Sequence, residues 1–171
     1  MNIHYMFSIN KINKLNKSEF LLTFGNIFEK TEWIANKAFE KKPFKDVKDL
    51  FSKIIEIYEK CDKEKIFKIF KAHPDLAIAK KLTRDSEKEQ NNASLNECSE
   101  EELKEFIKLN KKYKNKFKFP FIIAVKDKDK SEILKIFRKR IHNSIEDEYL
   151  EARNQVKKIA ITRLNKIFEI N

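Results

Sequence analysis

The sequence predicts an all-α protein, and three observations support that fold class. The chain of 171 residues contains 1 glycine and 3 prolines, so it has few of the residues that tight turns between strands require. Hydrophobic residues make up 41% of the chain, which is enough to form a core. Apolar residues recur at helical spacing along most of the chain. We therefore expect one domain over residues 1–171, an irregular bundle of roughly eight to nine helices.

Four helices are predicted in the N-terminal part of the chain. In the first, apolar residues line one face of residues 20–28, and Ser18 is expected to cap the helix. The same spacing predicts the other three helices at residues 33–38, 47–58 and 66–70.

Three further helices are predicted in the C-terminal half. Ser99 and Glu102 form the capping-box pattern of a helix that carries apolar residues to position 113. Ser131 is expected to begin the next helix. The last helix is predicted from Ser144 to about Ile167.

One segment, residues 117–125, breaks this helical pattern. It is rich in aromatic and β-branched residues and contains Pro120, which cannot donate a backbone hydrogen bond to a sheet. We therefore expect an extended connection near residues 117–125 rather than a central strand. Extended backbone in a helical domain leaves N–H and C=O groups that need partners, and some of those partners could belong to a ligand.

The last predicted helix places an arginine in line with its apolar stripe. Arg163 follows Ile159 by four residues and precedes Ile167 by four, so its side chain lies on the apolar face. An unpaired buried charge is very costly. Arg163 should therefore either extend its charged end to the edge of the core, or pair with a carboxylate of the protein or of a ligand.

Composition bears on the partners and the compartment. The net charge of +11 could indicate nucleic-acid binding, but the lysines are scattered and mixed with acids, so we favour solvated helix faces. Cys61 and Cys98 lack the spacing of a zinc site or a disulfide scaffold, which fits a reducing compartment. No apolar run approaches the roughly 20 residues of a membrane span, and the start lacks the features of a secretory signal. We expect a cytoplasmic protein without a membrane partner, and we do not favour nucleic acid as a partner.

The sequence KAHPDL, followed by SEKEQ, admits two interpretations. In the first, both stretches are helix ends. Pro74 suits the first position of a helix, so His73 would be the cap and Asp75 would favour the positive N-terminal end. Ser86 and Glu89 would form a second capping box. None of these residues would then take part in chemistry.

In the second interpretation the same residues form an active site. The proline after His73 holds the histidine rigidly, and histidine titrates near neutral pH, which suits proton transfer. Glu89, in the first turn of another helix, could orient the imidazole, and Gln90 offers a donor and an acceptor to a polar substrate. With Arg163 as an anion clamp, one pocket could hold a base, an orienting carboxylate and a guanidinium.

An ordered set of motifs connects this second interpretation with a known family. The set consists of Phe28-Glu29-x-x-x-Trp33-Ile34-Ala35, Pro43-Phe44, His73-Pro74-Asp75-Leu76, Ser86-x-x-Glu89-Gln90, Leu109-Asn110-x-x-Tyr113, Phe117-x-Phe119-Pro120-Phe121, Arg140-x-x-Asn143, Glu148 and Arg163-Leu164. In this order the motifs closely resemble the OHCU decarboxylase family, the 2-oxo-4-hydroxy-4-carboxy-5-ureidoimidazoline decarboxylases of urate breakdown. The resemblance begins after residues 1–15, which could form a loose N-terminal extension.

The resemblance implies an all-helical homodimer that decarboxylates an anionic ureide to (S)-allantoin, without a metal ion or an organic cofactor. It implies that His73 is catalytic, that Glu89 is its acidic partner and that Arg163 also belongs to the catalytic group. The positions implied to contact the substrate are Pro74, Ser86 and Gln90, together with the backbone of Phe121, Ile122 and Ile123.

In three places this sequence lacks a glycine that the family has. The residues found there are Ala77, which follows the HPDL motif, Ser94 and Lys118. If these positions need a left-handed backbone, each costs about 1–2 kcal/mol of strain. The exchanges leave open a relative that has drifted to a neighbouring ureide or lost catalysis. A basic helical nucleic-acid-binding module is the other alternative.

Overall fold

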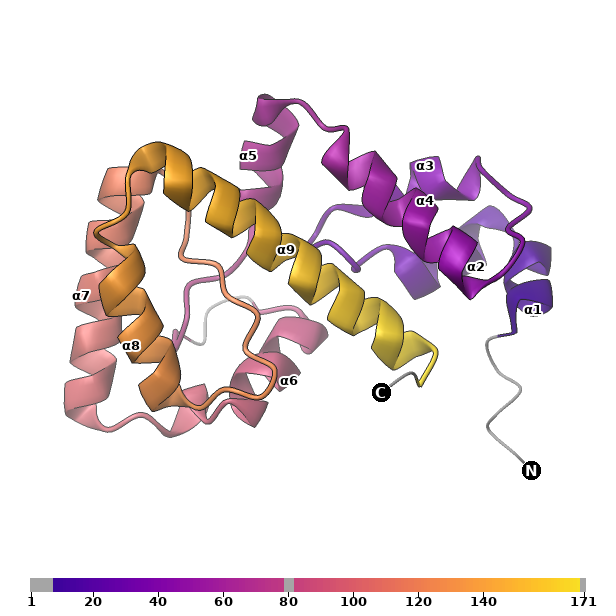
Figure 1. The fold of residues 1–171 in the computed structure, drawn as a ribbon. Helices are drawn as coiled ribbons and strands as arrows, with labels where there is room; N and C mark the ends of the chain where they lie inside the picture. Colours follow the sequence, from indigo (N-terminus) through magenta and orange to yellow (C-terminus); the bar gives the residue numbers. More distant parts are fainter. Residues whose placement is uncertain (1–7, 79–81, 170–171) are drawn as a thin grey trace. The chain divides into compact units, whose positions relative to one another are not determined.

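The computed structural model of the protein describes residues 8–78 and 82–169 (Figure 1). Within these residues the chain forms nine α-helices and no strand, which confirms the all-α fold class. The described residues divide into two compact units, residues 8–69 with 159–169 and residues 70–78 with 82–158, and each is described by itself. The helices are α1 (Ile9–Lys14), α2 (Lys17–Phe24), α3 (Glu32–Phe39), α4 (Val47–Glu59), α5 (Lys63–Ala72), α6 (Arg84–Asn92), α7 (Glu100–Phe117), α8 (Lys130–Arg140) and α9 (Ile145–Ile167), with a short 3-10 helix, η2 (Leu95–Glu97), before α7.

Aromatic side chains form much of the core of the first unit. The ring of Phe20 lies 4.6 Å from that of Phe24 and stacks on that of Phe44 at a centroid distance of 6.0 Å. Phe28 stacks on Tyr58 of α4 at 4.8 Å. All five side chains are buried, so the apolar spacing does mark residues that face the core.

The boundaries of α2 differ from the prediction. The helix begins after Asn16, whose side chain accepts from the Glu19 N–H at 3.0 Å, while the Glu19 carboxylate accepts from the Asn16 N–H at 2.9 Å. This reciprocal pair is a capping box, so the predicted cap at Ser18 is wrong. The helix ends at Phe24, and residues 25–28 form turns and bends rather than helix.

Residues 8–15 belong to the folded unit rather than to a loose extension. α1 buries Ile12, which is 1% exposed. Asn13 Nδ2 donates to the Phe44 carbonyl at 2.7 Å, and the Phe44 N–H donates to Asn13 Oδ1 at 2.8 Å. The expected extension is therefore wrong for residues 8–15, and residues 1–7 lie outside the described residues.

In the second unit, α7 and α8 run side by side in the same direction (Figure 1). Near their starts, Lys130 Nζ lies 2.8 Å from Glu102 Oε2. Near their ends, Lys116 Nζ donates to the carbonyls of Ile141 and Asn143 at 3.0 and 2.7 Å. Consecutive helices can run in the same direction only if the connection returns along them, and the segment that joins α7 to α8 makes this return.

That connection, residues 118–129, contains the predicted extended segment. α7 ends at Phe117, and Lys118 turns the chain with a left-handed φ of 67°. Residues 121–123 are non-helical and at most 5% exposed. The extended connection predicted near residues 117–125 is therefore confirmed, apart from its first residues.

The last helix agrees with its prediction. α9 begins directly after Ser144, whose hydroxyl accepts from the Asp147 N–H at 3.0 Å and so caps the helix. The boundary between the units falls within α9, because residues up to Lys158 belong to the second unit and those from Ile159 to the first. In the described parts of the chain, no helix is long and apolar enough to cross a membrane.

Candidate active site

His73 lies at the end of a helix, not at the start of one. Its N–H donates to the Phe70 carbonyl at 3.1 Å, in the last turn of α5. Residues 74–78 are not helical, so the predicted helix start at Pro74 is wrong. The residue before a proline avoids helical backbone, which explains why the helix stops here. His73 is 8% exposed, so the end of α5 holds it in a largely buried position.

Side chains of α6 and α7 hold the loop that follows α5. Gln90 accepts a hydrogen bond from the Ala77 N–H at 3.0 Å and donates to the Asp75 carbonyl at 3.4 Å. From α7, Asn110 Nδ2 donates to the Leu76 carbonyl at 3.0 Å. Gln90 and Asn110 are 6% and 2% exposed, so two buried amides bind backbone groups that lack helical partners. The loop is therefore fixed from two helices.

α6 carries three of the predicted site residues, and its cap differs from the prediction. Thr83 caps the helix by accepting from the Ser86 N–H at 3.3 Å. Ser86 and Glu89 therefore do not form the capping box, and Glu89 lies beyond the first turn. Ser86 is 5% exposed, whereas Glu89 is half-buried. Because Gln90 bonds the loop after His73, the structure places α6 against that loop.

Arg163 is buried in the first unit and pairs with a carboxylate of the protein. Its Nη2 lies 2.9 Å from Glu29 Oε2, and its Nη1 donates to the Asn26 carbonyl at 2.9 Å. The side chains of Arg163 and Glu29 are 5% and 0% exposed. The position of Arg163 on the apolar stripe left open whether its charged end reaches the edge of the core or pairs with a carboxylate of the protein or of a ligand. In the structure it pairs with a carboxylate of the protein, that of Glu29. A charge-assisted pair with an added backbone carbonyl fixes the plane of the guanidinium.

A sharp turn presents these two partners of Arg163. Gly25 follows α2, and its N–H donates to the Leu21 carbonyl at 2.7 Å. A Cβ at Gly25 would lie 2.4 Å from the Leu21 carbonyl oxygen, so any other residue would force the backbone to move. The single glycine of the chain thus allows the close turn that precedes Asn26 and Glu29.

Two buried side chains hold the extended segment that carries residues 121–123. Arg140 of α8 donates from Nη1 to the Ile122 carbonyl at 2.8 Å. Gln155 of α9 accepts from the Ala124 N–H at 2.8 Å. Arg140 and Gln155 are 5% and 8% exposed. These contacts serve backbone groups that would pair with a neighbouring strand in a sheet.

Arg140 belongs to a group of four side chains, the buried Tyr113, Arg140 and Glu148 and the half-buried Asn143, which we call the Glu148 cluster. Glu148 accepts from Arg140 Nε and Nη2 at 3.0 and 2.6 Å and from Asn143 Nδ2 at 2.7 Å. The Tyr113 hydroxyl also donates to Glu148. Burial raises the pKa of the Tyr113 phenol, and the charge of Glu148 raises it further. Tyr113 therefore remains a hydrogen-bond donor at any ordinary pH.

The three positions that lack a family glycine all have a left-handed backbone. The φ angles are 58° at Ala77, 55° at Ser94 and 67° at Lys118. Ala77, Ser94 and Lys118 therefore have the left-handed backbone for which strain was expected. The backbone keeps a conformation that glycine adopts readily, although each residue now carries a Cβ.

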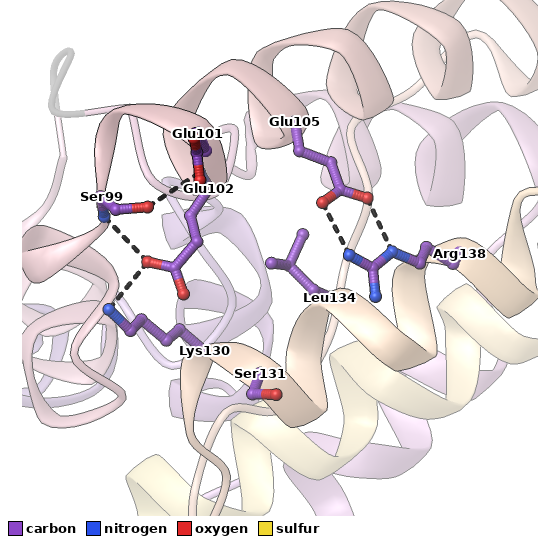
Figure 2. A pocket seen from close by; sticks show the side chains of 8 residues that line it. All are labelled: Ser99, Glu101, Glu102, Glu105, Lys130, Ser131, Leu134 and Arg138. Atoms are coloured by element: carbon purple, nitrogen blue, oxygen red, sulfur yellow. Dashed lines mark hydrogen bonds and ion pairs between the residues drawn. The ribbon is translucent and has the colours of Figure 1, made fainter.

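A surface pocket lies between α7 and α8, and no predicted site residue lines it (Figure 2). Lys130 pairs with Glu102 at 2.8 Å, and Arg138 pairs with Glu105 at 2.7 Å. Hydrogen bonds from these cations lower the pKa of both carboxyls. The charges of the pocket thus join the two helices. The pocket has a volume of about 560 Å³ and is lined by Ser99, Glu101, Glu102, Glu105, Lys130, Ser131, Leu134 and Arg138.

Both cysteines are present as thiols. Cys61 Sγ donates to the Ile57 carbonyl at 3.2 Å, and Cys98 Sγ donates to the Leu95 carbonyl at 3.3 Å. Burial raises the pKa of the Cys98 thiol, which makes it a weaker nucleophile at neutral pH. Within residues 8–78 and 82–169, no group of three or more His, Cys, Asp or Glu side chains is placed to hold a metal ion.

Sequence reasoning gave no role to several buried polar residues that hold the predicted site, namely Glu29, Asn110, Arg140, Glu148 and Gln155. Arg163 was found because it is a polar residue on the apolar face of a helix, and the same criterion could have found three of these residues. Glu148 and Gln155 lie four residues before and three after Ala152, on the apolar face of α9. Arg140 follows Phe137 by three residues on the apolar face of α8.

Comparison with known proteins matches the chain to one family along most of its length. A family model described as OHCU decarboxylase matches residues 13–165. The chain is 34% identical over 161 residues to the 2-oxo-4-hydroxy-4-carboxy-5-ureidoimidazoline decarboxylase of Haloferax volcanii, which covers 94% of this chain and 96% of that protein. It is 37% identical over 163 residues to a uric acid degradation bifunctional protein of Bacillus sp. (strain TB-90), covering 95% of this chain. The chain spans 32% and 33% of the length of the two bifunctional Bacillus relatives.

Solved structures share the fold at lower sequence identity. A crystal structure of (S)-allantoin synthase superimposes with a TM-score of 0.72 at 24% identity, covering 94% of this chain and 54% of that chain. A crystal structure of OHCU decarboxylase in the presence of (S)-allantoin gives a TM-score of 0.71 at 22% identity, covering 90% and 99% of the two chains. At these identities the likeness concerns the fold alone.

Proposed function

Because the chain belongs to the OHCU decarboxylase family, we propose that it decarboxylates 2-oxo-4-hydroxy-4-carboxy-5-ureidoimidazoline to (S)-allantoin. The observation that carries this proposal is the family match over residues 13–165, a region that retains His73, Glu89 and Arg163. We expect the reaction to proceed without a metal ion or an organic cofactor.

We assign the proton transfer of this reaction to His73. The bond between a ring carbon and the carboxylate breaks, carbon dioxide leaves, and the electron pair enters the conjugated ring. A proton must then reach one face of the ring, because the proposed product is a single enantiomer. The end of α5 and the loop held by Gln90 and Asn110 keep His73 in one place, which favours a defined direction of transfer.

Glu89 and Arg163 take the charged roles in this proposal. Glu89 orients the imidazole of His73. Arg163 holds the anionic substrate and stabilises the charge that develops as carbon dioxide leaves. The ion pair with Glu29 keeps the Arg163 guanidinium oriented, so little reorganisation is needed during the reaction.

The proposed substrate contacts are the side chains of Ser86 and Gln90, Pro74, and the backbone of residues 121–123. Gln90 makes one hydrogen bond through its oxygen and one through its nitrogen to the loop after α5. A glutamine amide offers two donors and two acceptor positions, so Gln90 can hold the loop and a substrate together. Residues 121–123 are buried as whole residues, and the family resemblance implies that their backbone faces the substrate.

The left-handed backbone at Ala77, Ser94 and Lys118 supports a decarboxylase over a relative with altered chemistry. The argument for a relative that has drifted to another ureide or lost catalysis was the absence of three family glycines. The backbone conformation that glycine would favour is nevertheless retained at all three positions. We also propose that residues 1–171 are a single OHCU decarboxylase-like domain, and that the protein is a cytoplasmic homodimer. The two cysteine thiols fit a reducing compartment.

The proposed function is tested by following the optical activity of the product. The substrate also decays without enzyme, so the rate and the circular dichroism of allantoin are measured with wild type, with His73→Asn and with no protein. We expect wild type to give (S)-allantoin faster than the spontaneous reaction. His73→Asn should lose roughly 10²- to 10⁴-fold in rate, the usual contribution of a general acid or base.

His142→Asn is the matched control, because His142 lies in the turn after α8 and has no assigned role. It should behave as wild type. Racemic allantoin formed at the spontaneous rate by wild type would rule out the decarboxylase function.

A further inference from the structure

The Glu148 cluster joins three helices of the second unit around one buried carboxylate. Tyr113 comes from α7, Arg140 from α8 and Glu148 from α9, and each residue is at most 5% exposed. Burying a carboxylate is costly unless several donors serve it, and here a guanidinium, an amide and a phenol donate to Glu148. The cluster is therefore held rigidly, and a further group of the protein that bonds to it is held in place as well.

The group that the cluster holds in place is the backbone of the extended segment, through a hydrogen bond from Arg140. The Nε and Nη2 atoms of Arg140 face Glu148, while Nη1 donates to the Ile122 carbonyl at 2.8 Å. Because a guanidinium is planar and rigid, binding one edge to Glu148 sets the direction of the other edge. The position of the Ile122 carbonyl is thus determined by the carboxylate of α9.

The neighbouring residue of the segment is held by the same side chains. The Phe121 ring lies 4.4 Å from the Arg140 guanidinium carbon and stacks on Phe137 at a centroid distance of 3.8 Å. Tyr113 meets the Phe121 ring edge-on at 5.2 Å. These contacts leave the side chain of Phe121 little freedom, so the backbone on both sides of it is constrained.

Stability alone is a weak reason for such a cluster. A buried ion pair can often be replaced by apolar side chains of similar volume without loss of stability, because removing two charges from water is costly. An apolar replacement could not donate to the Ile122 carbonyl. The contact that distinguishes this cluster from an apolar core is therefore the one it makes to the extended backbone.

We propose that Arg140, oriented by Glu148, is a positioning residue that holds the backbone of residues 121–123 in the geometry required for substrate. The inference rests on the proposed decarboxylation, in which that backbone contacts the substrate. Gln155 assists from α9 through its bond to the Ala124 N–H. A fixed carbonyl and fixed N–H groups would bind the ureide in one orientation, so that the proton reaches one face of its ring.

Two variants separate positioning from stability. Arg140→Lys keeps the charge but loses the fork that reaches both Glu148 and Ile122, whereas Tyr113→Phe removes a donor to Glu148 and leaves the Ile122 contact intact. We expect Arg140→Lys to lower kcat/KM by about 10- to 100-fold, chiefly through KM, and to lower the enantiomeric excess of allantoin after subtraction of the spontaneous reaction. Tyr113→Phe should melt at a lower temperature and keep KM and enantiomeric excess near wild type.

The matched control is Arg138→Lys, on the same helix two residues earlier. The side chain of Arg138 is 57% exposed and pairs with Glu105, so its exchange should leave kcat/KM, KM and enantiomeric excess unchanged. Gln155→Met is a second variant in case Arg140→Lys does not fold. It removes the acceptor for the Ala124 N–H and a donor to the half-buried carboxylate of Glu151, and should raise KM several-fold with a lower enantiomeric excess.

The positioning role is wrong if Arg140→Lys, or Gln155→Met in its place, loses activity only in proportion to its unfolded fraction. In that case KM and enantiomeric excess would match those of wild type. Failure of the decarboxylase function itself looks different, since wild type would then give racemic product at the spontaneous rate. That result would overturn both proposals.

Discussion

Ala77, Ser94 and Lys118 each combine a left-handed backbone with a side chain that opposes it. A Cβ in this conformation crowds the following carbonyl at a cost of about 1–2 kcal/mol, and glycine avoids that cost but gives up about 0.5–1 kcal/mol of entropy on folding. We therefore expect Lys118→Gly to raise the free energy of unfolding by about 0.5–1 kcal/mol. Urea unfolding followed by far-ultraviolet circular dichroism measures this change.

Lys111→Gly is the control for this experiment. Lys111 is an exposed lysine inside α7, where glycine should lower the free energy of unfolding by about 1 kcal/mol. The two exchanges remove the same side chain in or next to one helix and should have opposite signs. If Lys118→Gly destabilises the protein as much as Lys111→Gly, the φ of Lys118 is not a source of strain.

The contact between α7 and α9 through Tyr113 and Glu148 makes the stability of these helices depend on alkaline pH. The pKa of Tyr113 is raised in the folded protein, so below the ordinary tyrosine value of 10.0 both states keep the proton. Above that value the unfolded chain loses the proton and the folded protein retains it. The free energy of unfolding should then fall by about 1.4 kcal/mol per pH unit from this group.

Comparison of wild type with Tyr113→Phe isolates the effect, because the lysines that lose charge at similar pH are common to both. Wild type should be more stable by about 1–3 kcal/mol at pH 8, since the variant leaves a buried carboxylate without one donor. The difference should shrink above about pH 10 in urea unfolding series. Parallel stability curves from pH 8 to about pH 11 would show that Tyr113 does not carry the linkage.

The presence of helices was easier to predict than their ends. The capping box of Ser99 and Glu102 is found as predicted. At α2 and α6, however, Asn16 and Thr83 lie two and three residues before the predicted caps and cap the helices instead. Several polar residues can each cap a helix for about 1 kcal/mol, so the packing of the whole helix decides between them.

The pairing of distant residues was beyond sequence reasoning for a different physical reason. The apolar stripe predicted that Arg163 lies on a buried face, but its partner could have been any carboxylate or ligand. The structure shows contacts to Glu29 and, at a separation of 137 residues, to the carbonyl of Asn26. Such a contact depends on the turn after α2, which the helical period of a single segment does not encode.

The distribution of charge over the molecule argues against a nucleic-acid-binding function. Several lysines pair with an acid three or four residues away, as Lys53 does with Asp49 and Lys65 with Asp62. In α7, three acids occupy the first turn and lysines the last, an arrangement that complements the helix dipole. The net charge of +11 is thus spread over solvated faces, and binding to nucleic acid should be weak and without sequence preference.

A gel-shift series with single-stranded and duplex DNA at about 50 to 200 mM salt tests this expectation. Weak electrostatic binding has dissociation constants of about 10⁻⁴–10⁻⁶ M at physiological salt and loses affinity steeply as salt rises. We expect no complex below about 1 μM protein at physiological salt, and the same result for wild type and His73→Asn. A complex at about 10 nM that depends on base sequence would be in the range of specific recognition. That result would favour a nucleic-acid-binding module. Binding a DNA duplex needs a continuous positive surface, whereas binding an anionic ureide needs only one small site.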